Sequence, residues 1–369
     1  MSPSTIRNKL NLLHRIFFVT KWVFNKPKKT KILIYDNDCI KELNFLLENK
    51  SFEIFHTRHE QINIYVLLSS IFKNGLRNIK ENYKLNYFNF VQPKVVITLI
   101  DENPGFFKLK NIYNQAKYVS VQLHFKDNIF YDYINKFKKK NKNYKFKCDN
   151  TFVLGENDAV KYRNFIDSEI TNLGSIKNNN NIIKKNFKGK IKEILFIDSI
   201  PIKRNLNFKN LRGYKIFQLL KMYCREKKLK LSLLPKHRSN FEKKYREVYE
   251  DNDWIYLQSK NSLESYQTIN NAQFVVFDNT TLGYEALSKN IRGVCFPEIF
   301  PYKNYSKSFK KEGPFWSTNI NKKKLDKKID SVMQLTNKKW KKYIKEIAED
   351  IIIYNPNNKL FKQKLKKIL

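Results

Sequence analysis

Residues 271–297, NAQFVVFDNTTLGYEALSKNIRGVCFP, decide the fold of this chain. The apolar run at 274–277 is rich in β-branched and aromatic residues, which is typical of a buried parallel strand. Residues 278–281 can cap a helix with their side-chain oxygens, and helical spacing continues to residue 288. A further strand is predicted at 293–296. The stretch therefore predicts a strand, a helix and a second strand that form a parallel βαβ unit.

The turn between that strand and that helix is a candidate anion site. Backbone N–H groups and the positive end of a helix meet the carboxyl edge of a sheet there, where phosphates bind in open α/β folds. We expect the phosphates of a nucleotide to contact four positions, namely Asp278, Thr280, Thr281 and the backbone at Gly283. Glu285, one turn deeper, is expected to accept hydrogen bonds from a ribose. The alternative is that these residues only cap the helix.

The same alternation of strands and helices fills most of the chain. Strands are predicted at 31–35, 52–55, 95–100, 118–121 and 152–154, and again at 194–197, 229–234, 254–257 and 274–277. Between the two series, residues 178–190 are polar and lack periodicity, as in a linker. The fold class is therefore α/β, with two Rossmann-like domains that face a cleft.

The expected boundaries follow from these patterns. We expect an N-terminal basic amphipathic helix in residues 1–29, a first domain at 30–185, a second at 186–318, and C-terminal helices at 319–369 that cross back over both domains. A chain of 369 residues is long enough for two domains of ordinary size, and 41% apolar residues can fill their cores. No uninterrupted apolar run approaches about 18 residues, so no transmembrane helix is predicted.

Four cysteines without CxxC spacing argue against a zinc site or a disulfide framework and favour a reducing, cytoplasmic compartment. The net charge of +38, from 72 basic and 34 acidic residues, favours anionic partners such as nucleotide-sugars, phospholipid surfaces or acidic glycans. Nucleic acid is not expected as a partner, because the basic residues are spread along the chain and no nucleic-acid-binding motif accompanies them.

Residues 6–24 alternate apolar and basic side chains, which predicts a helix of about five turns. With Trp22 and Phe24 among its apolar residues, such a helix can lie in the interface of an anionic membrane, which would make the protein peripheral on the inner face of the cytoplasmic membrane. It can equally pack on the first domain. Both alternatives stay open.

A second basic cluster ends the predicted strand at 229–234. Lys236, His237 and Arg238 suit a diphosphate or a nucleotide leaving group, whose developing charge needs electrostatic stabilisation. The alternative is a solvated basic loop.

Several segments together resemble the surface-polysaccharide (O-antigen) biosynthesis proteins of the GT-B glycosyltransferase type. They are ILIYDND at 32–38, ITLIDEN at 97–103, FVLGE at 152–156, NLGS at 172–175, FDNTTLGYEAL at 277–287, GPFW at 313–316 and NPNN at 355–358. The resemblance implies a metal-independent GT-B glycosyltransferase without a cofactor. Its second half would bind the nucleotide-sugar, and its first half would bind a glycan or lipid-linked glycan acceptor.

Transfer needs a base that deprotonates the acceptor hydroxyl. Asp101 and Glu102, at the end of a first-half strand, are the candidates, with Asp36 and Asp38 in reserve. One alternative is a CDP-polyol glycerophosphotransferase-like enzyme, which would use a histidine from each half: His237 in the second, and His56, His59 or His124 in the first. Another is a non-catalytic GT-B-like glycan-assembly protein.

Overall fold

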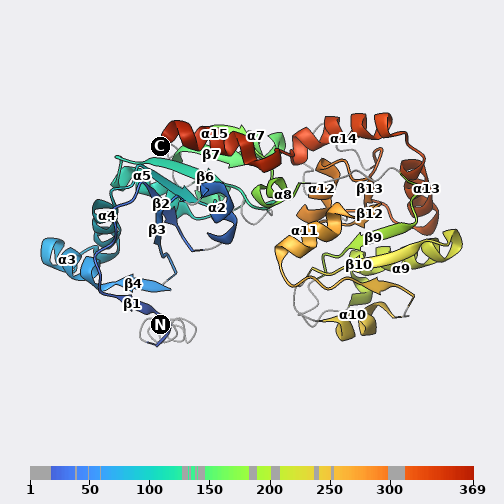
Figure 1. Ribbon diagram of the computed structural model, residues 1–369, viewed down its shortest axis with the longest axis horizontal. Helices are drawn as coiled ribbons and strands as arrows, with labels where there is room; N and C mark the ends of the chain where they lie inside the picture. The colour runs from blue at the N-terminus through green and yellow to red at the C-terminus, as the bar shows by residue number, and fades with distance from the viewer. Residues whose placement is uncertain are drawn as a thin grey trace.

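The described part of the protein contains two large parallel β-sheets, each covered by helices on both faces, and one small two-stranded sheet (Figure 1). The computed structural model describes residues 18–37, 40–48, 50–58, 60–126, 132, 134–137, 139, 146–182, 189–200, 208–236, 241–250, 253–297 and 312–369. The prediction of two Rossmann-like α/β domains is confirmed.

The first sheet has the strand order β3-β2-β5-β6-β7-β8, with every pair parallel. Its strands are β2 (Ile32–Tyr35), β3 (Phe52–Phe55), β5 (Val95–Thr98), β6 (Lys117–Val121), β7 (Phe146–Val153) and β8 (Ile166–Asn172). Its helices are α2 (Ile40–Leu47), α3 (Ile64–Asn74), α4 (Ile79–Val91), α5 (Pro104–Ile112), α7 (Glu156–Arg163) and α8 (Ile176–Asn180). Strand β2 is buried on both faces of this sheet. One face packs Ile32 and Ile34 into one core cluster, and the other packs Leu33 and Tyr35 into a second, which is why β2 is apolar throughout.

The second sheet has the order β11-β10-β9-β12-β13, also all parallel. Its strands are β9 (Glu193–Ile197), β10 (Lys230–Leu234), β11 (Ile255–Tyr256), β12 (Val275–Phe277) and β13 (Gly293–Cys295), and its helices are α9 (Arg212–Lys227), α10 (Glu242–Tyr249), α11 (Ser262–Asn270) and α12 (Thr281–Ser288). Counted along the chain this is the 3-2-1-4-5 order of a Rossmann half, so the order reverses between β9 and β12. Ligands of open α/β sheets bind at such a switch point.

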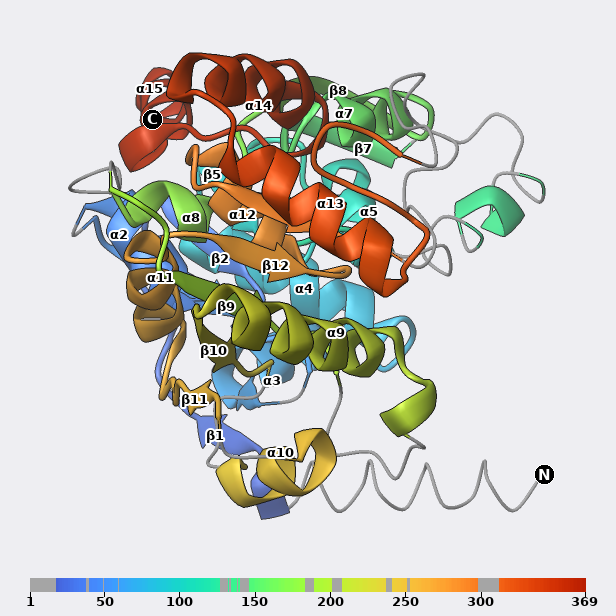
Figure 2. The ribbon, with the colours of Figure 1, turned by 90° about the vertical axis from the view of Figure 1, so that its right-hand side faces the viewer.

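Three C-terminal helices, α13 (Lys322–Met333), α14 (Asn337–Ile351) and α15 (Lys359–Ile368), follow one another over the second half and then the first (Figure 1). Figure 2 shows α13 beside α9 over one face of the second sheet. Helix α14 contacts both α12 and α7. Beyond it, the Ile353 N–H donates to the Leu154 carbonyl at 3.0 Å. A Cβ at Gly174, whose φ is +79°, would lie 2.0 Å from the Ile353 carbonyl oxygen, so this crossing requires glycine there.

The structure departs from the sequence prediction at the N-terminus. Lys21–Val23 form strand β1, which pairs in parallel with β4 (Gln61–Asn63), so the predicted helix does not extend through residue 24. Pairing with β4 outweighs the helical spacing of these three residues. Most of the predicted helix, residues 6–17, lies outside the described residues. No helix in the described part of the chain is both long and apolar enough to span a membrane.

The predicted linker is also partly wrong. Asn178 and Asn179 lie in helix α8 and are fully buried. Asn179 donates to the side chain of Asn358 at 2.9 Å, and Asn178 donates to the Ser288 hydroxyl at 3.1 Å. This polar run therefore joins the first half to α12 and to the C-terminal segment.

Candidate functional site

The switch point of the second sheet holds two buried carboxyl groups. Asp198 follows β9 and accepts hydrogen bonds from the hydroxyls of Tyr245 and Tyr249, both at 2.9 Å. Asp278 follows β12, and the Ser199 hydroxyl donates to it at 2.7 Å. Burial, with the nearby charge of Asp278, raises the pKa of Asp198 to about 7. Asp198 and Ser199 are not among the predicted site residues, although both follow the strand predicted at 194–197.

Asp278 fixes the turn that precedes α12. Its carboxylate accepts the Asn279 N–H at 2.5 Å, and burial raises its pKa. Thr280 is the N-cap residue of α12, and its side chain makes no capping hydrogen bond. Thr280 and Thr281 are both partly exposed. The turn therefore presents two hydroxyls at the N-terminus of a helix, and the alternative that Thr280 serves as a side-chain cap is not supported.

Two residues that were predicted to bind the nucleotide-sugar, Gly283 and Glu285, are buried and make contacts within the protein. The Gly283 N–H already donates to the Thr280 carbonyl at 3.1 Å, and a Cβ at this glycine would lie 2.3 Å from the Phe277 ring. Gly283 thus lets α12 approach β12 closely, and its own N–H is engaged within the helix; the contact of the backbone around Gly283 with phosphate stays a prediction. The Glu285 carboxylate is buried and accepts the Tyr266 hydroxyl at 2.9 Å. A ribose could reach it only if that contact were given up.

The basic cluster after β10 is described only at its first residue. Lys236 is exposed at the same sheet edge as Thr280, but β9 lies between β10 and β12, so the two are separated by two strand spacings, roughly 10 Å. His237 and Arg238 lie outside the described residues, and their predicted role stays a prediction.

A charged cluster occupies the carboxyl edge of the first sheet. Asp101 and Glu102 follow β5, and the ammonium group of Lys126 lies 2.6 Å from Asp101 and 2.8 Å from Glu102. The Tyr162 hydroxyl donates to the other Asp101 oxygen. His124 Nε2 lies 3.3 Å from Glu102 Oε1. The sequence pattern indicated the two carboxylates but not Lys126, which lies in the segment after β6, or Tyr162, which lies near the end of α7.

These contacts separate the roles of the two predicted bases. The Asp101 side chain is 1% exposed and both its oxygens are engaged, so it cannot meet a substrate hydroxyl without losing a partner. Glu102 is exposed, and the hydrogen bond with His124, together with Lys126, lowers its pKa to about 2. A carboxylate of such low pKa is a weak base. It is well placed, however, to orient the exposed imidazole of His124.

The reserve residues lie further along the same edge. Asp36 is buried beside Thr57 and Arg58, whereas Asp38 and His59 are outside the described residues. His56 lines a cavity of about 370 Å³ between β3, α3 and α4, and its Nδ1 is a buried polar atom without a hydrogen-bond partner.

One aromatic contact brings the two polar edges together. Phe125 stands between His124 and Lys126, and its ring meets the Tyr284 ring edge-on at 5.5 Å. Tyr284 belongs to α12, one turn beyond Thr280 and Thr281, and its ring also packs on Phe277. The loop that holds Glu102 therefore touches the helix whose N-terminus is the predicted phosphate site.

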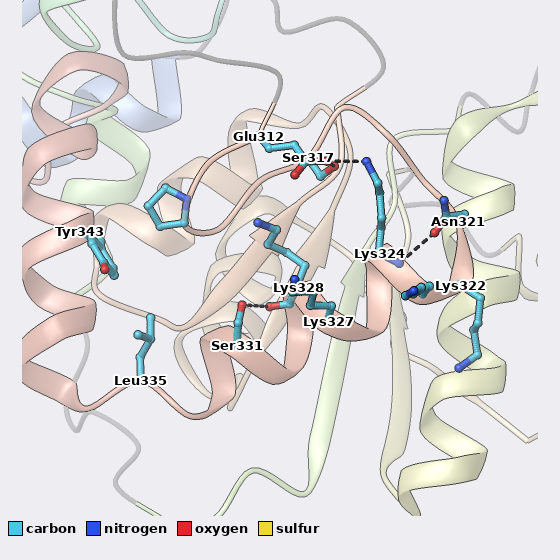
Figure 3. A pocket seen from close by; sticks show the side chains of 12 residues that line it. Glu312, Ser317, Asn321, Lys322, Lys324, Lys327, Lys328, Ser331, Leu335 and Tyr343 are labelled. Atoms are coloured by element: carbon cyan, nitrogen blue, oxygen red, sulfur yellow. Dashed lines mark hydrogen bonds and ion pairs between the residues drawn. The ribbon is translucent and has the colours of Figure 1, made fainter.

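A second, lysine-rich cavity lies away from these residues. Its volume is about 930 Å³, and its lining residues come from α13, α14 and the segment before α13 (Figure 3). Lys324 pairs with Glu312 at 2.7 Å, and Lys328 donates to the Gly313 carbonyl. None of the predicted site residues lines this cavity. Within the described part of the chain, no three His, Cys, Asp or Glu side chains form a group that could hold a metal ion.

A family model described as "putative O-antigen biosynthesis protein" matches residues 119–369, about two thirds of the chain. The chain belongs to this family. The resemblance inferred from the sequence is thereby confirmed, and membership of the O-antigen biosynthesis family supports a role in glycan biosynthesis. The matched segment includes His124, Lys126 and the whole second half, whereas Asp101 and Glu102 precede it.

Solved structures share the GT-B fold of this O-antigen biosynthesis family member at low sequence identity. A "putative UDP-N-acetylglucosamine 2-epimerase" from Listeria monocytogenes has a TM-score of 0.56 and 12% identity, over 92% of this chain and 96% of the other. The wall teichoic acid polymerase TagF has a TM-score of 0.51 and 10% identity, over 100% and 99%. A UDP-GlcNAc 2-epimerase from Methanocaldococcus jannaschii has a TM-score of 0.50 and 13% identity, over 86% and 98%. No curated protein matches the sequence.

Proposed function

We propose that this protein is a metal-independent GT-B glycosyltransferase that moves a sugar from a nucleotide-sugar donor to a growing surface glycan of the O-antigen or capsule type. The second half binds the donor at the N-terminus of α12, with Thr280 and Thr281 at the phosphates and Lys236 on the same edge. The first half binds the glycan or lipid-linked glycan acceptor at the edge that carries Glu102 and His124. No cofactor takes part.

The observation that carries this proposal is the Phe125–Tyr284 contact at 5.5 Å. It joins the loop that positions Glu102 to the helix that would bind the donor phosphates. A group-transfer enzyme needs its acid–base residue and its leaving-group site within one substrate length of each other. Family membership and the GT-B fold agree with this assignment.

The chemistry follows from the two edges. Displacement at the anomeric carbon breaks the bond to the nucleotide phosphate, and negative charge develops on that phosphate. The helix N-terminus and the nearby cations stabilise this charge. On the other side, the acceptor hydroxyl loses its proton as it attacks. His124, oriented by Glu102, is the group best placed to accept that proton, with Glu102 itself as the alternative.

One observation favours a second candidate, transfer of a polyol phosphate from a CDP-linked donor. That reaction would use a histidine from each half, and His124 with its carboxylate partner supplies the first-half histidine. His237 would supply the other. In this reaction the phosphate attached to the polyol is attacked, and CMP leaves.

Donor binding tests the proposal directly. The melting temperature of the purified full chain should rise with one class among CMP-, UDP-, GDP- and CDP-linked donors. Thr281→Val and His237→Ala should each reduce that rise without lowering the melting temperature of the free protein. The matched control is Thr268→Val, which changes a partly exposed threonine on α11 and should leave the donor-induced rise in melting temperature unchanged.

Product analysis separates the two candidates. An acceptor that gains a sugar without a phosphate group supports the glycosyltransferase. An acceptor that gains a polyol through a phosphodiester bond supports polyol-phosphate transfer. Donor binding that survives both substitutions would show that the donor-site assignment is wrong. Donor binding without turnover would instead favour a non-catalytic glycan-assembly protein.

A further inference from the structure

Helix α3 is rich in apolar residues but poorly buried. Seven of its eleven residues, in the sequence IYVLLSSIFKN, are apolar, yet only Val66 and Ser70 are buried. Phe72 is 85% exposed, and Tyr65 and Leu68 are exposed as well. An amphipathic helix normally turns its apolar stripe toward the core, so an outward apolar stripe needs another explanation.

The inward face of α3 shows how this arises. Ser70 accepts a hydrogen bond from Asn86 of α4 at 2.9 Å, so α3 meets its neighbour partly through polar side chains. Tyr65, Leu68 and Phe72 follow at spacings of three and four and lie on one outer face, and the exposed Leu76 comes just after the helix. In Figure 1, α3 lies at the outer end of the first half, farthest from the second.

A second segment extends this apolar surface. Strand β1 pairs with β4, which runs directly into α3, and Phe18, Val19 and Phe24 on either side of β1 are exposed. Phe18 is 80% exposed. Strand β1 and helix α3, about forty residues apart in the sequence, lie beside each other at one end of the molecule (Figure 1), and both carry exposed large apolar residues. Together they form what we call the apolar end, defined by residues 18–24 and 65–76.

Basic residues accompany the apolar end. Residues 18–35 contain five lysines and no acidic residue. The ammonium groups of Lys26 and Lys73 lie over the Phe90 ring at 5.3 and 6.0 Å from its centroid, and Tyr65 meets the same ring at 5.3 Å. Large apolar side chains flanked by lysines are the combination that binds at the surface of an anionic bilayer.

We propose that the apolar end is the surface through which this protein lies on an anionic lipid membrane. The exposed side chains of α3 enter the headgroup region, and the lysines contact acidic headgroups. A second copy of the chain is a poorer occupant, because a contact between two copies of the apolar end would bring two sets of lysines, Lys26 and Lys73 among them, into one interface. The proposal locates membrane contact on residues of the folded first half.

Sedimentation with lipid vesicles tests the proposal. The full chain should bind vesicles of phosphatidylcholine mixed with phosphatidylglycerol more tightly than phosphatidylcholine alone, and added salt should weaken binding. Leu68→Ser with Phe72→Ser should lower the partition coefficient by roughly tenfold to a hundredfold, because two large side chains lose their burial. Leu263→Ser on α11 is the matched control, since Leu263 is 52% exposed and Leu68 48%.

Residues 1–17 are present in every variant, so any binding they contribute cancels from the comparison. Unchanged vesicle binding by the double variant, with an unchanged melting temperature, would overturn the proposal. So would a dimer in solution that the double substitution dissociates, because the apolar end would then be a contact between two copies. No donor or acceptor is added, so the outcome does not depend on the proposed transfer reaction.

Discussion

Replacing Lys126 with methionine should destabilise the first half strongly. The Lys126 side chain is fully buried, and its ammonium group lies 2.6 Å from the buried Asp101 carboxylate. Methionine fills a similar volume without the charge, so the substitution leaves the Asp101 carboxyl group without its cationic partner in a site from which water is excluded. Removing one partner of a buried ion pair costs about 3–5 kcal/mol. Because the Tyr162 hydroxyl still donates to Asp101, we expect the lower end, about 3 kcal/mol.

Hydrogen exchange measured by mass spectrometry reports this loss locally. Peptides that cover β5 and β6 should exchange roughly a hundredfold faster in Lys126→Met, since each 1.4 kcal/mol is a factor of ten. Peptides from the second sheet serve as the internal control and should change little. Global unfolding by urea is less suitable, because two halves with separate cores need not unfold as one unit.

A double-mutant cycle shows whether the ion pair is the cause. Adding Asp101→Asn to Lys126→Met removes the second buried charge, so the double variant should lose about 1–3 kcal/mol less than the sum of the two single losses. Losses of stability that simply add in the double variant would show that Lys126 and Asp101 do not depend on each other. A loss below about 1 kcal/mol in Lys126→Met alone would also refute the buried ion pair as a source of stability.

Two further predictions concern the second sheet. The folded-state pKa of Asp198, about 7, lies above its ordinary 3.8, so the free energy of unfolding should fall as the pH rises from about 4 to about 7. Asp198→Asn should flatten that fall when the opening of second-sheet peptides is followed by hydrogen exchange at several pH values, corrected for the intrinsic pH dependence of exchange. A slope equal to wild type would contradict the assignment. Gly283→Ala should lower stability by about 1–3 kcal/mol because its Cβ would meet the Phe277 ring 2.3 Å away. A variant of unchanged melting temperature with weaker donor binding would instead show that Gly283 serves the phosphate.

The strands were predictable where parallel pairing buries both of their faces. Such strands contain continuous apolar runs, so β2, β5, β9 and β12 stand out from the sequence. Strand β8, with the sequence IDSEITN, was missed because it lies at an edge of the sheet and carries polar residues along its length. Strand β1 was missed because its three residues become a strand only through β4, a partner forty residues away.

The candidate site was predictable only in part. The carboxylates Asp101 and Glu102 and the hydroxyls of Thr280 and Thr281 stand at strand ends, which sequence reasoning can find. Their partners come from other elements: Lys126 from the segment after β6, and Tyr162 from α7. Sequence spacing carries no information about such contacts, since they depend on the order of the strands in the sheet. For the same reason, nothing near Glu285 in the sequence indicated that Tyr266 would cover it.

Helix α14 is hydrogen-bonded to the second half near its first residues, and the segment just after its last residue is hydrogen-bonded to the first half. The Trp340 indole donates to the Asn290 carbonyl at 3.0 Å, and the Ile353 N–H is held by Leu154. Together with the Phe125–Tyr284 and Asn178–Ser288 contacts, these two hydrogen bonds join the halves at several separate points. In Figures 1 and 2, α10 and β1 both lie on the side of the molecule opposite α14. A protein that rests on a bilayer near β1 would therefore turn α10 of its second half toward the membrane and α14 away from it.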